Sequence, residues 1–286
     1  MRTARPIVVG VDGSAASLAA VRWAAIAAAR RHTPLHLVNA LGVPGEALPV
    51  LGTLLFDTSA HRKAGESALS SGRSIVRELT ESIGDLEVET FLESPSPVTA
   101  LVRRSAHAEL LTVGTRGLGT FERVLLGSVA VELTRHARCP VAIIPGIDEA
   151  PPPLPQSPVL VGVDGSLCSA HAVEIAFDEA SARRVGVVAM TIWSRRDPPA
   201  ETQVRTGALL AERLAGVAEK YPDVPVDRVV AEGQPARRLL QEARNAQLLV
   251  LGSRGRGGVA GAALGSVSQA VLQGTRIPVI IATRRQ

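Results

Sequence analysis

Two glycine-rich segments carry the residues best suited to binding chemistry. The segment from Gly114 to Ser128 has the form G-x2-G-x9-G-S, and the segment from Gly252 to Ser266 has the same form. Each follows an apolar run, an order typical of a strand, a glycine turn and the start of a helix. Glycine lets backbone N–H groups approach a ligand closely, and the first turn of a helix carries unpaired N–H groups with partial positive charge. Both segments therefore predict a site for phosphate or a similar anion.

The duplication separates these segments from ordinary tight turns. A lone glycine motif of this length would be explained equally well by a plain strand-to-helix connection. The two copies also share their spacing and the arginine before the second glycine, which is Arg116 in one and Arg254 in the other. The residues between the glycines differ, so backbone geometry and phosphate binding together would explain what the copies keep.

Each half of the chain begins with the same short sequence. The sequence V-G-V-D-G-S occurs near the start, where it contains Asp12, and again in the second half, where it contains Asp164. The apolar run before each aspartate predicts a strand buried on both faces, as in a parallel sheet. The Ala-rich sequence between Ser14 and Arg31, and its counterpart up to Arg184, then predict a helix.

Strand and helix patterns alternate through both halves. Strands are expected at Ile7–Val11, Leu35–Leu41, Glu87–Leu92, Leu110–Val113 and Val141–Ile144, and again at Val159–Val163, Val187–Trp193, Val226–Ala231, Leu248–Leu251 and Val279–Ala282. The later helices are expected at His61–Ile83, Val98–Ala106, Pro199–Tyr221 and Ala236–Ala243, and from Ser128 and Ser266 onward. Such alternation forms parallel sheets with helices on both faces. The fold class is therefore α/β, with two tandem doubly wound open sheets of five strands.

In such sheets a ligand lies outside the carboxyl ends of the strands, where the strand order reverses. If the order is 3-2-1-4-5, Asp12 and Gly114 end neighbouring strands and share one crevice. Asp164 and Gly252 would do the same in the second half.

A proline-rich segment, residues 147–156, separates the halves and is expected to be an extended, semi-rigid linker. The chain of 286 residues suits two domains of about 140 residues, each large enough for its own core. We therefore predict one domain at residues 1–146 and another at 157–286.

Composition excludes several classes of protein. The chain is 46% hydrophobic and 20% charged, and it has no apolar run of the roughly 18 residues that a membrane span needs. The first residues lack the pattern of a secretory signal, so we expect a cytoplasmic protein. Cys139 and Cys168 form no metal or redox spacing and are expected to be reduced thiols. A net charge of +4, with 2% aromatic residues, does not indicate nucleic-acid binding.

Three motifs, taken in order, resemble the universal stress protein family: V-G-V-D-G-S, the G-x2-G-x9-G-S loop, and Cys-Pro-Val or Ile-Pro-Val before the last strand. All three occur twice, so the resemblance covers nearly the whole chain as a tandem pair. The family implies an ATP-binding fold of the adenine nucleotide alpha hydrolase type, with strand order 3-2-1-4-5. It also implies dimerisation through the fifth strand, here as an intramolecular pseudo-dimer of the two halves. A homodimer of the chain and an unknown protein partner are further expectations.

The resemblance also assigns the nucleotide site. Asp12 and Asp164 would lie at the base and ribose end, Ala40 and Ile192 would line the adenine pocket, and Val113 and Leu251 would pack near the ribose. The phosphates, with Mg²⁺ as an option, would lie against Gly114, Arg116, Gly117, Gly127, Ser128, Val129 and Ala130, and against Gly252, Arg254, Gly255, Gly265, Ser266, Val267 and Ser268. Because Ser268 replaces Ala130, the second half is expected to bind phosphate slightly better, by about 1 kcal/mol.

Other nucleotide-binding readings fit less well. The sequence Gly255-x-Gly257-x-x-Ala260 is a degenerate dinucleotide-binding motif, but no acidic residue follows about 20 positions later. The Walker pattern of P-loop ATPases is absent. No histidine recurs at equivalent positions, and no catalytic or metal-ligating residue is assigned. We therefore expect a nucleotide-binding regulatory protein of stress or growth, with a slow ATPase and a nucleotide-free interaction scaffold as alternatives.

Overall fold

The chain was analysed as a computed structural model, which describes residues 4–42, 58–115, 126–146, 154, 156–193, 199–255 and 264–283. It divides into two compact units, one made of Met1–Asp148 with Arg285–Gln286 and the other of Glu149–Arg284. We call them the first and the second repeat. Most of the predicted linker, 147–153 and 155, lies outside the described residues.

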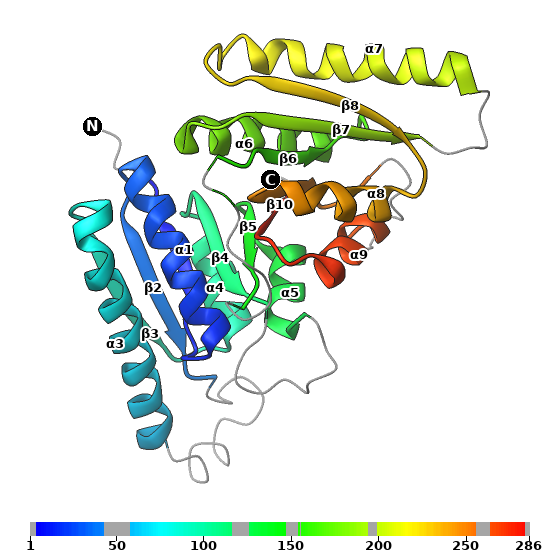
Figure 1. Ribbon diagram of the computed structural model, residues 1–286. Helices are drawn as coiled ribbons and strands as arrows, with labels where there is room; N and C mark the ends of the chain where they lie inside the picture. The colour runs from blue at the N-terminus through cyan, green and yellow to red at the C-terminus, as the bar shows by residue number, and fades with distance from the viewer. Residues whose placement is uncertain are drawn as a thin grey trace. The chain divides into compact units, whose positions relative to one another are not determined.

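The first repeat alternates strands and helices as predicted (Figure 1). Its elements are β1 (Ile7–Gly10), α1 (Ala15–Arg31), β2 (Leu35–Ala40), α3 (Thr58–Ile83), β3 (Val88–Glu93), α4 (Pro97–Ser105), β4 (Leu110–Gly114), α5 (Ser128–His136) and β5 (Val141–Ile144). The paired strands are all parallel, in the order β3-β2-β1-β4-β5. This is the predicted order 3-2-1-4-5.

The second repeat has the same architecture. Its elements are β6 (Val159–Gly162), α6 (Leu167–Arg183), β7 (Val187–Trp193), α7 (Pro199–Ala218), β8 (Val226–Glu232), α8 (Pro235–Glu242), the short 3-10 helix η2 (Ala243–Asn245), β9 (Leu248–Gly252), α9 (Ser266–Gly274) and β10 (Val279–Ala282). Its strands run in the order β8-β7-β6-β9-β10, again parallel. The α/β fold class is confirmed.

Helices cover both faces of each sheet. In the first repeat α1 packs beside α3, while α4 packs beside α5; in the second repeat α6 packs beside α7, and α8 beside α9. The central strands are fully buried, because Ile7, Val9, Val159 and Val161 have no exposed surface. Burial on both faces explains why these strands read as continuous apolar runs instead of alternating ones.

The first helix of each repeat has clear start and stop signals. Ser14 caps α1 by accepting a hydrogen bond from the Ser17 backbone N–H, and Ser166 caps α6 in the same way. His32 and Arg184 end these helices in the left-handed conformation, with φ of 51° and 56°. Side-chain capping and a left-handed final residue together fix where each helix begins and ends.

Several predicted bounds were wrong by one to three residues. Helices α4 and α8 begin at Pro97 and Pro235, because proline occupies the first helical position. Helix α7 ends at Ala218 and not at Tyr221, since the N–H of Tyr221 bonds to the carbonyl of Ala218 in a tighter turn. Among the described residues no helix is long and apolar enough to cross a membrane.

One buried hydroxyl of the first repeat has no counterpart in the second. Thr112 in β4 is fully buried, and its Oγ1 has no hydrogen-bond partner within the described part of the chain. The equivalent residue of β9 is Val250, which is also fully buried. We expect Thr112→Val to stabilise the first repeat by about 1 kcal/mol, because it removes an unsatisfied polar group without changing the shape of the side chain.

Urea unfolding of the full chain tests this, with Trp193→Phe in the background so that Trp23 alone reports the first repeat. A midpoint unchanged or lowered by Thr112→Val would show that the hydroxyl is satisfied in solution.

Candidate functional site

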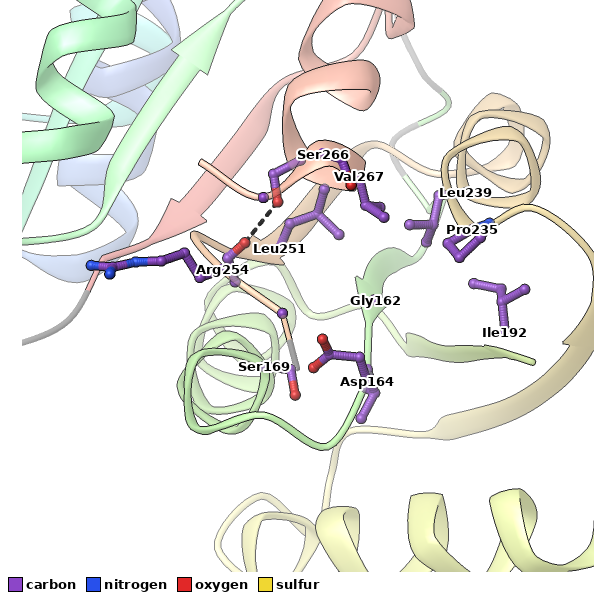
Figure 2. Close-up of a pocket in the computed structure, with 15 residues that line it drawn as sticks. Gly162, Asp164, Ser169, Ile192, Pro235, Leu239, Leu251, Arg254, Ser266 and Val267 are labelled. Atoms are coloured by element: carbon purple, nitrogen blue, oxygen red, sulfur yellow. Dashed lines mark hydrogen bonds between the residues drawn. The ribbon is translucent and has the colours of Figure 1, made fainter. Parts of the chain in front are cut away.

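The second repeat has a cavity of about 360 Å³ at the carboxyl ends of its central strands. Its walls come from β6, β7, β9 and the N-terminal ends of α8 and α9 (Figure 2). Ligand pockets in proteins occupy about 300–1,000 Å³, so this volume suits a small organic molecule. The site lies where the strand order reverses, between β6 and β9, as expected for an open α/β sheet.

Every residue predicted for the second site lines this cavity. They are Asp164, Ile192, Leu251, Gly252, Arg254, Gly255, Gly265, Ser266, Val267 and Ser268. The fold thus brings together residues from four separate segments of the chain. Five further lining residues were not predicted: Gly162, Val163, Ser169, Pro235 and Leu239.

Asp164 has a structural role as well as a place in the cavity wall. Its Oδ1 accepts a hydrogen bond of 2.9 Å from the backbone N–H of Ser166, which holds the turn before α6. The glycine loop approaches the other oxygen closely, since a Cβ built on Gly255 would lie 2.5 Å from Asp164 Oδ2. Gly255 does not have positive φ. Glycine is therefore needed here for contact with the carboxylate and not for its backbone angles.

The N-terminus of α9 opens on the cavity without a side-chain cap. Gly265 is the N-cap and makes no side-chain bond, and the first helical hydrogen bond runs from Gln269 N to the Gly265 carbonyl at 3.0 Å. The N–H groups of Ser266 and Val267 precede that bond. By contrast, α6 is capped by its own Ser166. An uncapped helix N-terminus attracts anions through these N–H groups and the helix dipole.

The glycine loop is closed at its base by a backbone hydrogen bond. Gly265 N donates to the Ser253 carbonyl at 2.8 Å, and Ser253 N donates to the Ala282 carbonyl at 3.1 Å. A Cβ on Gly252 would lie 2.9 Å from the Cys168 carbonyl carbon, so the strand end lies directly against α6. These contacts fix both ends of the loop beside Asp164. Residues 256–263 of the loop lie outside the described residues.

Two predicted phosphate contacts have other roles in this structure. The Ser268 hydroxyl donates to the Gly252 carbonyl at 2.8 Å, so its proton is already engaged within the protein. The Arg254 backbone lines the cavity and its carbonyl accepts from Ser166 Oγ at 3.3 Å. Figure 2 shows the Arg254 side chain extending away from Asp164 and the apolar wall.

The opposite end of the cavity is apolar. Ile192 on β7, Pro235 and Leu239 on α8, and Leu251 on β9 form this wall, and Figure 2 shows Ile192, Pro235 and Leu239 grouped beyond Gly162. The cavity therefore combines a flat apolar region with a helix N-terminus and a carboxylate. A molecule with an aromatic ring at one end and a phosphate at the other matches this arrangement.

The first repeat builds the same frame from its described residues. Asp12 Oδ1 accepts hydrogen bonds from Ser14 N at 2.9 Å and from Ser14 Oγ at 2.6 Å. Helix α5 begins after Gly127, also without a side-chain cap, and Gly127 N donates to the Thr115 carbonyl at 2.6 Å. A Cβ on Gly114 would lie 2.6 Å from the Ala16 carbonyl carbon.

The remaining predicted residues of the first repeat divide into two groups. Ala40 is the last residue of β2, Val113 is the last but one of β4, and Ser128, Val129 and Ala130 form the first turn of α5. Arg116 and Gly117 lie outside the described residues. Neither repeat groups three or more His, Cys, Asp or Glu side chains around a metal position, within the ranges that the structure describes.

Comparison with known proteins identifies the family. The universal stress protein family matches the chain twice, over residues 3–145 and 157–283. The chain belongs to the universal stress protein family. Two universal stress proteins of Mycobacterium tuberculosis are 42% and 44% identical to it; the alignments cover 96% of this chain in both cases, and 96% and 95% of the relatives. A universal stress protein of Mycolicibacterium smegmatis is 42% identical over 98% of the chain.

The fold is also that of known universal stress proteins. The crystal structure of a universal stress protein from Archaeoglobus fulgidus superposes with a TM-score of 0.72, at 18% identity, and covers 98% of this chain and 96% of that one. The tandem arrangement of two universal stress protein repeats, expected from the duplicated motifs, is confirmed.

The lining residues missed by sequence reasoning had weak signals. Pro235 and Leu239 are one helical turn apart on α8, so they share a face, but apolar residues at this spacing are typical of any packed helix. Ser169 was visible only as the third residue after the Ser166 cap. Stronger signals were the proline repeated at the start of α4 and α8, and the repeated V-G-V-D-G-S sequence, which contains Gly162 and Val163.

Proposed function

We propose that this universal stress protein binds ATP, one molecule in each repeat, and acts as a cytoplasmic, nucleotide-dependent regulator of stress or growth. The observation that carries the proposal is the second-repeat cavity of about 360 Å³, which joins an apolar wall to the uncapped N-terminus of α9. The apolar wall suits an adenine ring, and the helix N-terminus suits a triphosphate.

Different residues of the cavity would contact the phosphates, the ribose and the base. The N–H groups of Ser266 and Val267 and the backbone of Gly252 and Gly255 would hold phosphate oxygens. Asp164, whose Oδ2 faces the glycine loop, would accept hydrogen bonds from ribose hydroxyls. Ile192 and its apolar neighbours would take the base. If Mg²⁺ accompanies ATP, it would be held chiefly by phosphate oxygens and water, as is usual for this ion.

Calorimetric titration of the full chain tests the proposal. We expect two ATP molecules to bind per chain and GTP to bind more weakly. Absence of heat with ATP, or a preference for GTP, would contradict it. The same samples, incubated with ATP and assayed for released phosphate, distinguish a binding protein from a slow ATPase.

We also propose that the two repeats form an intramolecular pseudo-dimer through their fifth strands, as the tandem family match allows. The argument is general: an apolar edge strand such as Val141–Ile144 tends to associate unless it is paired or covered. Residues 1–146 expressed alone should therefore homodimerise. A stable monomer at high micromolar concentration in sedimentation experiments would contradict the pairing.

A further inference from the structure

The side chains at the apolar end of the site differ in size between the two repeats. In the second repeat Ile192, the last residue but one of β7, and Leu251 of β9 both line the cavity. The equivalent residues of the first repeat are Ala40 on β2 and Val113 on β4. Alanine lacks the branched chain of isoleucine, and valine is one carbon shorter than leucine. The first repeat therefore offers less side chain at both positions.

The backbone frame around these positions is the same in both repeats. A Cβ on Gly162 would meet Leu251 Cδ2 at 2.7 Å and Leu239 Cδ1 at 3.4 Å. A Cβ on the equivalent Gly10 would meet Val113 Cγ1 at 3.2 Å and Leu101 Cδ1 at 3.0 Å. In each repeat a glycine, a leucine of the covering helix and the residue before the strand's last glycine thus meet at one point. The size difference is one of side chains on a shared frame.

The residue beside each position also differs. Ala40 pairs in register with Glu93 of β3, whereas Ile192 pairs with Ala231 of β8. Glu93 is only 8% exposed, and its two oxygens accept hydrogen bonds from Arg103 and Arg104 of α4. Residues at matching positions of neighbouring strands lie about 5 Å apart on the same face. The neighbour of Ala40 is therefore a carboxylate held by two arginines, and the neighbour of Ile192 is an alanine.

Arg104 also anchors this carboxylate. Its guanidinium lies 3.6 Å from the centre of the Phe91 ring, on the same strand as Glu93. The carboxylate is thus held from two directions, by ion pairs and by a cation that stacks on a ring. Because both of its oxygens are held, the Glu93 side chain stays in place beside the small side chain of Ala40.

We propose that Ala40 and Ile192 are specificity-determining residues that give the two repeats different base selectivity. The first repeat accepts an adenine nucleotide with an added group on its base, and the second repeat excludes it. This inference rests on the proposed binding of ATP. It concerns the side chains around the base and not the glycine loops.

Full-length chains with one working site separate the two repeats. Gly255→Asp places a second carboxylate against Asp164 and disables the second site, while Gly117→Asp disables the first. Each chain is titrated with ATP, N6-benzyl-ATP and 2-methylthio-ATP, which add bulk at two positions of the ring. With Gly255→Asp, at least one analogue should bind within about threefold of ATP. With Gly117→Asp, the same analogue should bind at least about tenfold more weakly than ATP, because overpacking an apolar pocket is unfavourable.

Reciprocal substitutions test the assignment to single residues. In the Gly117→Asp chain, Ile192→Ala should restore binding of the analogue to the second site. In the Gly255→Asp chain, Ala40→Ile should abolish binding of the analogue to the first site. Val188→Ala, which trims an apolar residue at the far end of the same strand β7, serves as the control and should leave the selectivity unchanged. Equal ratios of analogue to ATP affinity at both sites would overturn the inference while leaving ATP binding intact. Failure of both chains to bind ATP would instead overturn the proposed function, and this inference with it.

Discussion

We expect the Gly255→Ala variant to lose ATP binding in the second repeat by at least about tenfold in affinity, while the first repeat keeps its own site. A Cβ at this position would lie 2.5 Å from Asp164 Oδ2, a distance that real Cβ atoms essentially never show. Either the loop or the carboxylate must move. Because both are proposed to contact the nucleotide, a displacement of about 1 Å in either one removes well-placed hydrogen bonds.

The expected result in calorimetry is a fall from two ATP molecules per chain to one. Gly216→Ala is the matched control, because Gly216 lies in α7 and a Cβ there would meet no atom within 4 Å. Its stoichiometry should stay at two. If Gly255→Ala binds two ATP molecules with unchanged affinity and remains folded, the glycine loop does not belong to the site.

The largest effect on stability is expected from Glu179→Ala, which should destabilise the second repeat by about 3 kcal/mol or more. Glu179 and Arg183 are side chains of α6 that are 2% and 7% exposed, with 2.9 Å between Glu179 Oε2 and Arg183 Nε. Arg183 also donates to Gln247 Oε1 at 3.0 Å. Removing the carboxylate takes a counter-charge at 2.9 Å away from a buried guanidinium, and a desolvated charge is costly without its counter-charge.

In the first repeat the equivalent arginine pairs with a carboxylate from a different position. Its arginine, Arg31, bonds to Glu109 at 3.1 Å, and Glu109 is the equivalent of Gln247. The carboxylate that pairs with the arginine thus precedes the fourth strand in the first repeat and lies on the helix in the second. The double variant Glu179→Ala with Gln247→Glu places the carboxylate where the first repeat has it. It should recover part of the lost stability, since glutamate cannot replace the hydrogen bond that Gln247 Nε2 donates to the Ser157 carbonyl.

Urea unfolding measures both effects, with Trp23→Phe in the background so that Trp193 alone reports the second repeat. The control is Glu174→Ala, which removes a 61% exposed carboxylate from the same helix α6, 3.4 Å from His171 Nδ1, and should change stability by less than about 1 kcal/mol. A loss below 1 kcal/mol for Glu179→Ala, or no recovery in the double variant, would contradict this account of the ion pair.

The residues that could be predicted from sequence are those whose backbone demands restrict the residue type. Gly114 and Gly252 lie so close to the first helix of their repeat that no Cβ fits, and Asp12 and Asp164 bond to the N–H two residues later. Such constraints leave the same residue in both repeats. Duplication then made the strand order and the crevice predictable, because alternating strands and helices allow few topologies.

Side-chain direction and side-chain partners could not be predicted in the same way. The family resemblance placed Arg254 with the phosphates, and its side chain extends away from Asp164 and the apolar wall (Figure 2). Ser268 was expected to favour phosphate binding, but its hydroxyl donates to the Gly252 carbonyl. These choices depend on which neighbour is nearest in the folded chain. The pairing of Arg31 with Glu109, and of Arg183 with Gln247, could not be predicted for the same reason.

The central claim is that each repeat holds one adenine nucleotide between its apolar wall and its uncapped helix. Native mass spectrometry of the full chain, incubated with ATP or with GTP and then freed of unbound nucleotide, tests it most directly. We predict a mass increase equal to two ATP molecules per chain, reduced to one by Gly255→Ala, and no comparable increase with GTP. A chain that retains no ATP, or that retains GTP equally well, would contradict the claim.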